Sequence, residues 1–311
     1  MYIVSRGYIS PNTYIIQHTK ANLNRKTQKI LYFLPSNEGN TVDKKKYSRI
    51  VVKVGTSTLS HPTGKLNLRR IEELSRVLSD LKNAGTEIVL VSSGAVGAGI
   101  ARIGLDRRPK STEEKQALAA IGQGELMKIY ERFFAHYGQT VAQLLLTKDV
   151  VDNEERRKSA ASTFRILFDL SCLPIVNEND PVSSAQLETK SGDKISFGDN
   201  DTLSAYVAEL CEADLLINLS DSEGFFTADP RNDPTATLIE RVERITPELL
   251  ACAGGAGTAG GTGGMRSKLE AAQIAGAAGI PMFLAHGAEP EVLYSILEGK
   301  ARGTYFAAEK K

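Results

Sequence analysis

Short apolar runs alternate with amphipathic segments along most of the chain. The runs are rich in β-branched residues and have few polar interruptions, which is typical of strands buried on both faces of a parallel sheet. In the segments between them, apolar residues recur every three or four positions, as on one face of a helix. This alternation predicts an α/β fold in which helices cover both faces of a parallel sheet.

The predicted elements follow one another without an internal repeat or linker. We expect strands at residues 50–54, 87–91, 141–146, 173–176, 215–219 and 281–284. We expect helices after the turn at 92–99 and at 68–84, 112–137, 154–170, 202–211, 246–252, 265–279 and 291–297. The segment 112–137 is expected to form one or two helices, broken near Gly122 and Gly124. Residues 48–305 are therefore assigned to one domain, followed by a tail at 306–311.

The first predicted strand carries a lysine, Lys53, among β-branched residues and ends at the sequence Gly55, Thr56, Ser57. Burying an unpaired ammonium group is costly. Glycine allows a tight turn, and the amides and hydroxyls that follow it can face an anion. The stretch therefore indicates a phosphate site, although an edge-strand lysine that reaches water would give the same pattern.

Two further glycine-rich turns are candidates for anion binding. The turn at 92–99 joins a strand to a helix, where backbone amides can hold an anion; close helix–sheet packing also favours small residues there. In the run 260–268, Lys268 falls in the first turn of a helix, where the helix dipole disfavours a cation unless an anion is nearby. A surface lysine after a loop is the alternative. The GxGxxG match at 255–260 is rejected because it does not join a strand to a helix.

Four aspartates stand at or just after the carboxyl ends of predicted strands: Asp180, Asp199, Asp201 and Asp221. Ligands of open parallel sheets bind at that edge. These carboxylates could position lysines, bind an amine or hold Mg²⁺, and the acids at 199–201 could also cap a helix. None of the four histidines, including His286, lies near these motifs in the sequence, so we interpret them as structural or exposed.

Composition excludes several classes of protein. The chain has 311 residues and a net charge of +1, which argues against a dedicated nucleic-acid binder. Three cysteines without a CxxC motif suggest neither zinc nor a disulfide framework and fit a reducing cytoplasm. No apolar run approaches the ~20 residues that span a bilayer.

Residues 1–47 differ from the rest, with eight Lys or Arg against two Asp or Glu, a net charge of +6. We interpret them as a flexible basic extension, or as translation from an upstream start. A basic arm that binds a partner or nucleic acid is the alternative.

Two lysines, glycine-rich turns and carboxylates without a nucleophile indicate phosphoryl transfer by positioning and charge neutralisation. The residues by themselves therefore predict a nucleotide-dependent kinase and leave its acceptor open.

Seven motifs in order together resemble the glutamate 5-kinase family of the amino-acid kinase superfamily. They are VKVGTS at 52–57, SSGA at 92–95, KQA at 115–117 with AIGQ at 120–123, NEND at 177–180, GDND at 198–201, TADPR at 227–231 and GTGGM at 261–265. The resemblance covers residues 48–305. It implies a three-layer α/β/α sandwich with an open, mostly parallel sheet.

The resemblance also implies a reaction, in which ATP phosphorylates the side-chain carboxylate of L-glutamate to form L-glutamyl 5-phosphate. This is the first step of proline biosynthesis, with proline as a feedback inhibitor. By motif position, Lys53 and Lys268 would neutralise the transferring group and Asp201 would orient both lysines. Ser93, Asp180 and Asn200 would hold glutamate. ATP would contact Lys53, Ser220, Asp221, Thr262, Gly263, Gly264, Met265, Arg266, Ser267 and Lys268.

The remaining expectations concern partners. Mg²⁺ would be bound through the nucleotide rather than by a metal site of the protein. The resemblance implies a cytoplasmic homo-oligomer that could hand its product to glutamate-5-semialdehyde dehydrogenase, with no nucleic-acid or membrane partner. The polar segment 181–196 could be a lid that also senses proline. Many relatives carry a C-terminal domain of the RNA-modification type, which we expect to be absent here. A kinase for another acceptor, or a silent nucleotide- or proline-binding regulator, remains the alternative.

Overall fold

The computed structural model describes residues 47–183, 197–252 and 264–309. Nearly all of the N-terminal extension lies outside the described residues, as do Thr262, Gly263 and most of the segment 181–196. The expectations for those residues therefore stay predictions.

The centre of the fold is one mixed sheet with strand order β3-β4-β2-β1-β5-β7-β8-β6. All neighbouring strands are parallel except β7 and β8, so the expected open and mostly parallel sheet is confirmed. The strands are β1 (Arg49–Val54), β2 (Glu87–Ser92), β3 (Val141–Leu146), β4 (Leu173–Glu178), β5 (Leu215–Ser220), β6 (Arg241–Val242), β7 (Met282–His286) and β8 (Thr304–Phe306).

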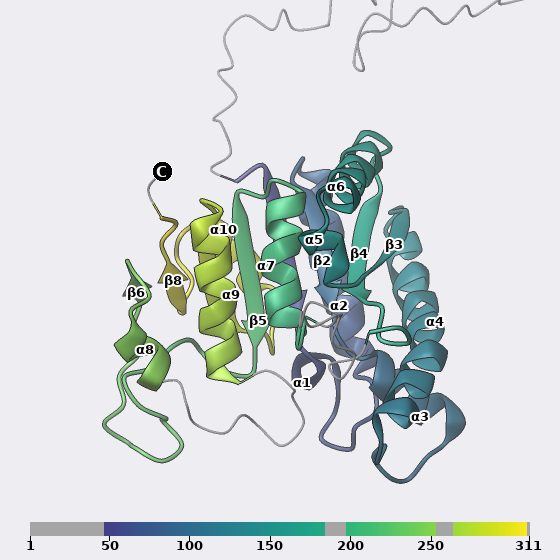
Figure 1. Ribbon diagram of the computed structural model, residues 1–311, viewed down its shortest axis with the longest axis horizontal. Coiled ribbons are helices and arrows are strands. Elements are labelled where there is room, and N and C mark those ends of the chain that lie inside the picture. The colour runs from purple at the N-terminus through teal and green to yellow at the C-terminus, as the bar shows by residue number, and fades with distance from the viewer. Residues whose placement is uncertain (1–46, 184–196, 253–263, 310–311) are drawn as a thin grey trace, which may run out of the picture. The chain divides into compact units, whose positions relative to one another are not determined.

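Helices connect the strands and cover both faces of the sheet (Figure 1). They are α1 (Thr56–Leu59), α2 (Leu68–Asn83), α3 (Ala95–Ile103), α4 (Thr112–His136), α5 (Asp149–Asp152), α6 (Glu154–Asp169), α7 (Asn200–Leu210), α8 (Pro247–Cys252), α9 (Met265–Ala277) and α10 (Val292–Leu297). Sequence-local signals set several of their ends. Asn67, for example, accepts a hydrogen bond from the amide of Arg70 at 3.1 Å and so begins α2. Gly85, at φ +92°, follows its end.

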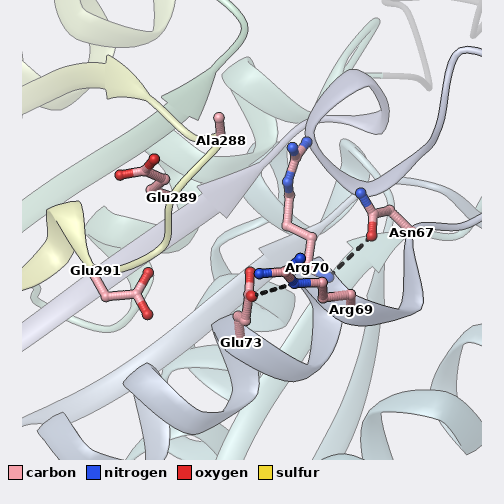
Figure 2. A pocket seen from close by; sticks show the side chains of 7 residues that line it. All are labelled: Asn67, Arg69, Arg70, Glu73, Ala288, Glu289 and Glu291. Atoms are coloured by element: carbon pink, nitrogen blue, oxygen red, sulfur yellow. Dashed lines mark hydrogen bonds and ion pairs between the residues drawn. The ribbon is translucent and has the colours of Figure 1, made fainter.

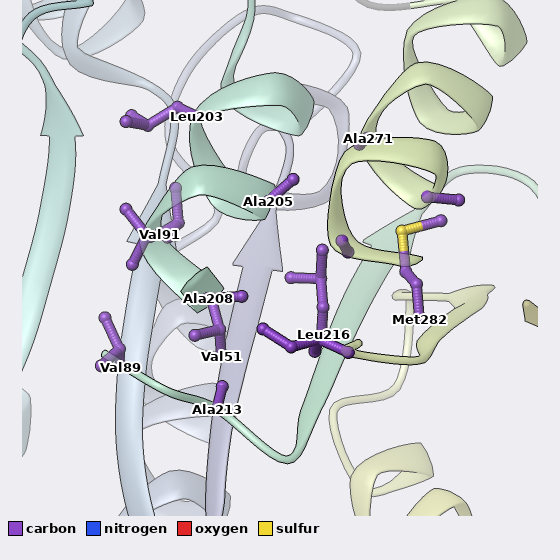
Figure 3. Close-up of a cluster of buried hydrophobic side chains, with 14 of the residues drawn as sticks. Val51, Val89, Val91, Leu203, Ala205, Ala208, Ala213, Leu216, Ala271 and Met282 are labelled. Carbon is purple, nitrogen blue, oxygen red and sulfur yellow. The ribbon is translucent and has the colours of Figure 1, made fainter. Parts of the chain in front are cut away.

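Alternate residues of the central strands pack into two separate apolar clusters, because successive side chains point to opposite faces. Val51 and Leu216 lie on the face covered by α6, α7 and α9 (Figure 3). Val52 and Ile217 lie on the face covered by α2, α4 and α10. Lys53 and Asn218 share the parity of Val51 and Leu216, so the strand pattern directs them to the α7 face.

Of the two alternatives for the segment 112–137, the structure shows the single helix: α4 is not broken near Gly122 and Gly124. The two glycines have different surroundings. A Cβ on Gly122 would lie 1.8 Å from the carbonyl oxygen of Ala95, and one on Gly99 would lie 2.0 Å from that of Leu118. A Cβ on Gly124 would meet nothing within 4 Å. Gly122 therefore marks the place where α3 and α4 touch backbone to backbone.

Four short elements were not predicted: α1, α5, β6 and β8. Each has four or fewer residues, too few to show a helical or strand period. Among the described residues, no helix combines the length and apolarity needed to cross a membrane.

Candidate active site

Two lysines and one aspartate from three elements meet near the carboxyl edge of the sheet. Lys53 is the fifth residue of β1, Asp201 lies in the first turn of α7 and Lys268 in the first turn of α9. Lys53 forms an ion pair with Oδ1 of Asp201, and Lys268 lies 3.2 Å from Oδ2. All three side chains are buried, with Asp201 only 1% exposed. Both lysines were expected to need an anion nearby, and Asp201 is that anion for each of them.

Two uncharged groups complete the hydrogen bonds of this carboxylate. Nδ2 of Asn218 donates to Oδ1 at 2.7 Å, and the hydroxyl of Ser267 donates to Oδ2 at 3.0 Å. Burial alone would raise the pKa of Asp201, but Lys53 and Lys268 together hold that pKa well below its usual range. The cluster therefore contains two cations and one anion, and its surplus positive charge can attract an anionic ligand.

Asp199, two residues before Asp201, is the N-cap of α7. Asp199 caps α7 by accepting the amide of Thr202 at 2.9 Å. Burial, followed by the charge of Asp201, raises the pKa of Asp199. Both alternatives considered for the acids at 199–201 are therefore present: one acid caps the helix and the other binds the lysines.

Asn200 belongs to a chain of amide hydrogen bonds. Its Nδ2 donates to Oγ of Ser93 at 2.8 Å and to Oδ1 of Asn177 at 2.9 Å. Asn177 in turn donates to Oε1 of Gln123 at 2.9 Å. The chain connects the end of β2, the end of β4 and α4, and so fixes the orientation of Asn200.

Asp180 follows β4 and is half-buried, next to Glu178. Burial, together with the negative charge of Glu178, raises the pKa of Asp180 to about 6. Oε1 of Glu178 accepts the hydroxyl of Ser183 and, at 3.1 Å, the amide of Phe197. Glu178 thus contacts both residues that border the segment 184–196, which lies outside the described residues.

Ser220 and Asp221 stand at the end of β5. The Ser220 hydroxyl donates to Asp221 at 3.1 Å, and the Ser220 carbonyl accepts the amide of Gly287 at 2.7 Å. His286 is exposed, as the sequence interpretation of the histidines had it, but it is also the register partner of Ser220 on β7 and so lies near these motifs in the fold. The sequence could not show this, because the pairing of β5 with β7 joins distant segments. Arg231 makes hydrogen bonds of 3.0 and 2.8 Å to Asp229 in its own turn.

The glycine-rich loop is described only where it enters α9. Gly264 precedes the helix, and its carbonyl oxygen lies 2.9 Å from Oγ of Ser267, where it is the alternative to Asp201 as acceptor of the single hydroxyl hydrogen. Arg266 is exposed, and Met265 is half-buried. These residues adjoin the cluster of Lys53, Asp201 and Lys268, because Ser267 and Lys268 follow them directly in α9.

A separate pocket of about 470 Å³ lies between the start of α2 and the loop after β7 (Figure 2). Arginines and glutamates dominate its walls, and Arg70 also donates to the carbonyl of Thr58 at 2.9 Å. None of the sequence-predicted site residues lines it. Within the described residues, no cluster of three or more His, Cys, Asp or Glu side chains could hold a metal ion.

Sequence reasoning did not assign a role to three residues of these networks: Gln123, Asn177 and Asn218. The last of them carried a readable signal, since it interrupts the apolar strand LLINLS. A buried amide in such a strand needs a partner. The other two stand in motifs that supported the resemblance, but their link to Asn200 is visible only in the fold.

Known proteins support both the fold and the family. A sequence model described as "Amino acid kinase family" matches residues 48–286. A glutamate 5-kinase of Clostridium perfringens is 51% identical over 262 residues, covering 84% of this chain and 96% of that protein. The glutamate 5-kinase of Clostridium tetani is 52% identical over 266 residues, covering 86% and 97%.

Solved structures agree at the level of fold. The structure of an isopentenyl phosphate kinase of T. acidophilum has a TM-score of 0.55 and 15% identity, covering 83% of this chain and 99% of that one. A second isopentenyl phosphate kinase structure has a TM-score of 0.58 at 14% identity. On the sequence matches and the sheet topology together, the chain belongs to the amino acid kinase family and, within it, groups with the glutamate 5-kinases.

Proposed function

We propose that the protein transfers the γ-phosphoryl group of ATP to the side-chain carboxylate of L-glutamate, as the first step of proline biosynthesis. The observation that carries the proposal is the buried cluster of Lys53, Asp201 and Lys268 at the carboxyl edge of the sheet. The relatives at about half identity supply the acceptor, since their names specify glutamate.

The reaction requires little covalent chemistry from the protein. One oxygen of the glutamate side-chain carboxylate attacks the γ-phosphorus, and the bond from that phosphorus to the β,γ-bridging oxygen breaks to release ADP. The acceptor is already ionised near pH 7, so no general base is needed. Lys53 and Lys268 neutralise the transferring group, while Asp201 holds both ammonium groups in place.

The hydrogen bonds around Asn200 indicate how the acceptor site is polarised. Nδ2 of Asn200 is already used by Ser93 and Asn177, which leaves its Oδ1 as an acceptor for the ammonium group of glutamate. Oγ of Ser93 accepts from Asn200, which leaves its O–H to donate to a glutamate carboxylate. Asp180 supplies an anionic partner for the same ammonium group.

ATP is proposed to lie beside the lysine cluster, near Ser220, Asp221 and the start of α9. Its phosphates would be surrounded by residues at and just before the start of α9, namely Thr262, Gly263, Gly264, Met265, Arg266 and Ser267. The net positive cluster suits the phosphates of a nucleotide that brings Mg²⁺ with it. When bound, the ion would neutralise charge on the β- and γ-phosphates.

The resemblance supports three further proposals. Proline inhibits the enzyme, the enzyme is a cytoplasmic homo-oligomer, and its product passes to glutamate-5-semialdehyde dehydrogenase. The suggestion that 181–196 is a proline-sensing lid falls mostly outside the described residues and is left as a hypothesis.

The decisive assay measures ADP formation from Mg²⁺-ATP with L-glutamate, with hydroxylamine added to trap an acyl phosphate as the hydroxamate. Parallel reactions contain N-acetylglutamate, aspartate, carbamate or UMP, each with and without proline. Glutamate-dependent hydroxamate supports the proposal, and its suppression by proline supports feedback inhibition. Turnover with a different acceptor only would refute the glutamate assignment, and nucleotide binding without turnover would favour a silent regulator.

The role of Asp180 predicts a pH dependence. A substrate ammonium group binds the ionised carboxylate, and protons compete with it below the pKa of about 6. The KM for glutamate should therefore rise as pH falls below 6, approaching about tenfold per pH unit, with kcat changing less. Initial rates from pH 5 to 8 measure this. Asp180→Asn should raise KM at pH 8 and lose the dependence; an unchanged KM would remove Asp180 from the substrate site.

A further inference from the structure

Asn218 is a fully buried amide in the middle of β5. Its neighbours in the sheet register are Lys53 on β1 and Leu284 on β7. Its Nδ2 donates to Oδ1 of Asp201 at 2.7 Å. Among the described residues, no donor reaches its own Oδ1, which is buried. This orientation is the one that charge favours, because the flipped amide would place two oxygens against each other.

A buried, unpaired amide oxygen costs folding free energy, and an apolar residue of similar size would avoid that cost. Folding stability therefore does not account for an asparagine at this position, and its hydrogen bond to Asp201 points to a role at the site. Asp201 lies in the first turn of α7, whereas Lys53 and Asn218 belong to the sheet. The amide is thus an uncharged link between the sheet and the carboxylate that holds both lysines.

We propose that Asn218 is a positioning residue for phosphoryl transfer, a role that rests on the proposed function. Each oxygen of Asp201 has one lysine and one uncharged donor: Lys53 and Asn218 on Oδ1, Lys268 and Ser267 on Oδ2. Four donors fix the rotation of the carboxylate, and with it the direction of both ammonium groups. Because the amide is neutral, it does this without reducing the surplus positive charge of the cluster.

The first test is Asn218→Leu, which removes the donor and the unpaired acceptor at similar volume. We expect kcat to fall about tenfold, because Asp201 keeps three partners but loses its fixed rotation. Both KM values should stay within about twofold, since the substrate contacts remain. The melting temperature should not fall. Ile217→Val, on the opposite face of β5, is the control and should leave kcat unchanged.

The second test is Asn218→Asp, which keeps the size of the side chain but adds a titratable carboxyl. That carboxyl would face Asp201 on α7, Lys53 on β1 and Lys268 on α9, with Asp199 nearby. Ionised, it cancels the surplus charge of the cluster. We expect kcat at pH 8 to fall about a hundredfold or more and to recover partly at lower pH, whereas the wild-type kcat should show no such recovery.

Wild-type kcat in Asn218→Leu would overturn the proposal, as would a loss explained entirely by a smaller folded fraction. Should Asn218→Leu not fold, the pH profile of Asn218→Asp decides, and a profile parallel to wild type counts against the role. Failure of the proposed function is distinguishable, because the wild type itself would then lack glutamate-dependent turnover. The same variants would then be compared with whichever acceptor the wild type uses.

Discussion

Replacing Lys268 by methionine is expected to lower kcat by about a thousandfold, with a much smaller change in the KM for glutamate. The ammonium group is 3.2 Å from Asp201 and nearly inaccessible to solvent, so its charge acts through a medium of low polarity. Methionine fills the space but removes the charge, and the cluster then has one cation and one anion. Lys53→Met should give a loss of the same order, because it removes the other cation.

Steady-state kinetics with glutamate and ATP varied separately would measure both effects. The control is Lys158→Met, which removes an exposed lysine paired with Glu154 on α6 and should keep wild-type kinetics. A thermal melt of each variant tests whether the loss of kcat arises in the phosphoryl-transfer step or from a smaller folded fraction. Removing one partner of a buried ion pair also destabilises the fold, but Asp201 keeps the other lysine. An unchanged kcat in Lys268→Met would remove that lysine from the phosphoryl-transfer step.

Gly122→Ala is expected to destabilise the protein by about 3 kcal/mol or more, an unusually large effect for adding one methyl group. The new Cβ would lie 1.8 Å from the carbonyl oxygen of Ala95 and 2.3 Å from the amide of Gly99. Both are backbone atoms, so the clash can be relieved only by moving α3 away from α4. That movement would also displace Gln123 and disturb its bond to Asn177. We therefore expect a higher KM for glutamate in whatever folded protein remains.

Gly124→Ala, two residues along the same helix, is the matched control. Its Cβ would meet nothing within 4 Å, and glycine is a poor helix former. This variant should be more stable than wild type by about 0.5–1 kcal/mol. Chemical denaturation of the two variants should give shifts of opposite sign. Equal shifts in the free energy of unfolding would mean that the close crossing of α3 and α4 does not cause the destabilisation of Gly122→Ala.

The sequence alone was sufficient for the order and type of the long elements, and for the edge of the sheet at which the site lies. Strand burial and helix amphipathicity are local periodicities, and a functional residue at a strand end is adjacent to that strand in the chain. The awkward position of Lys53 in a buried strand was visible for the same reason. Elements of a few residues, such as α1 and β8, escaped detection because they are shorter than the period that would identify them.

Only the tertiary structure decided which groups share a partner. Lys53 and Lys268 each indicated an anion, but their local patterns could not show that Asp201 serves both, which only the family resemblance implied. The sequence also could not show that Gly122 is a contact and not a helix break, or that Asn218 reaches the same carboxylate as the lysines. Each of these contacts joins segments far apart in the chain. The packing of α7 and α9 on the sheet sets the distances between these residues. No local pattern of residues encodes that packing.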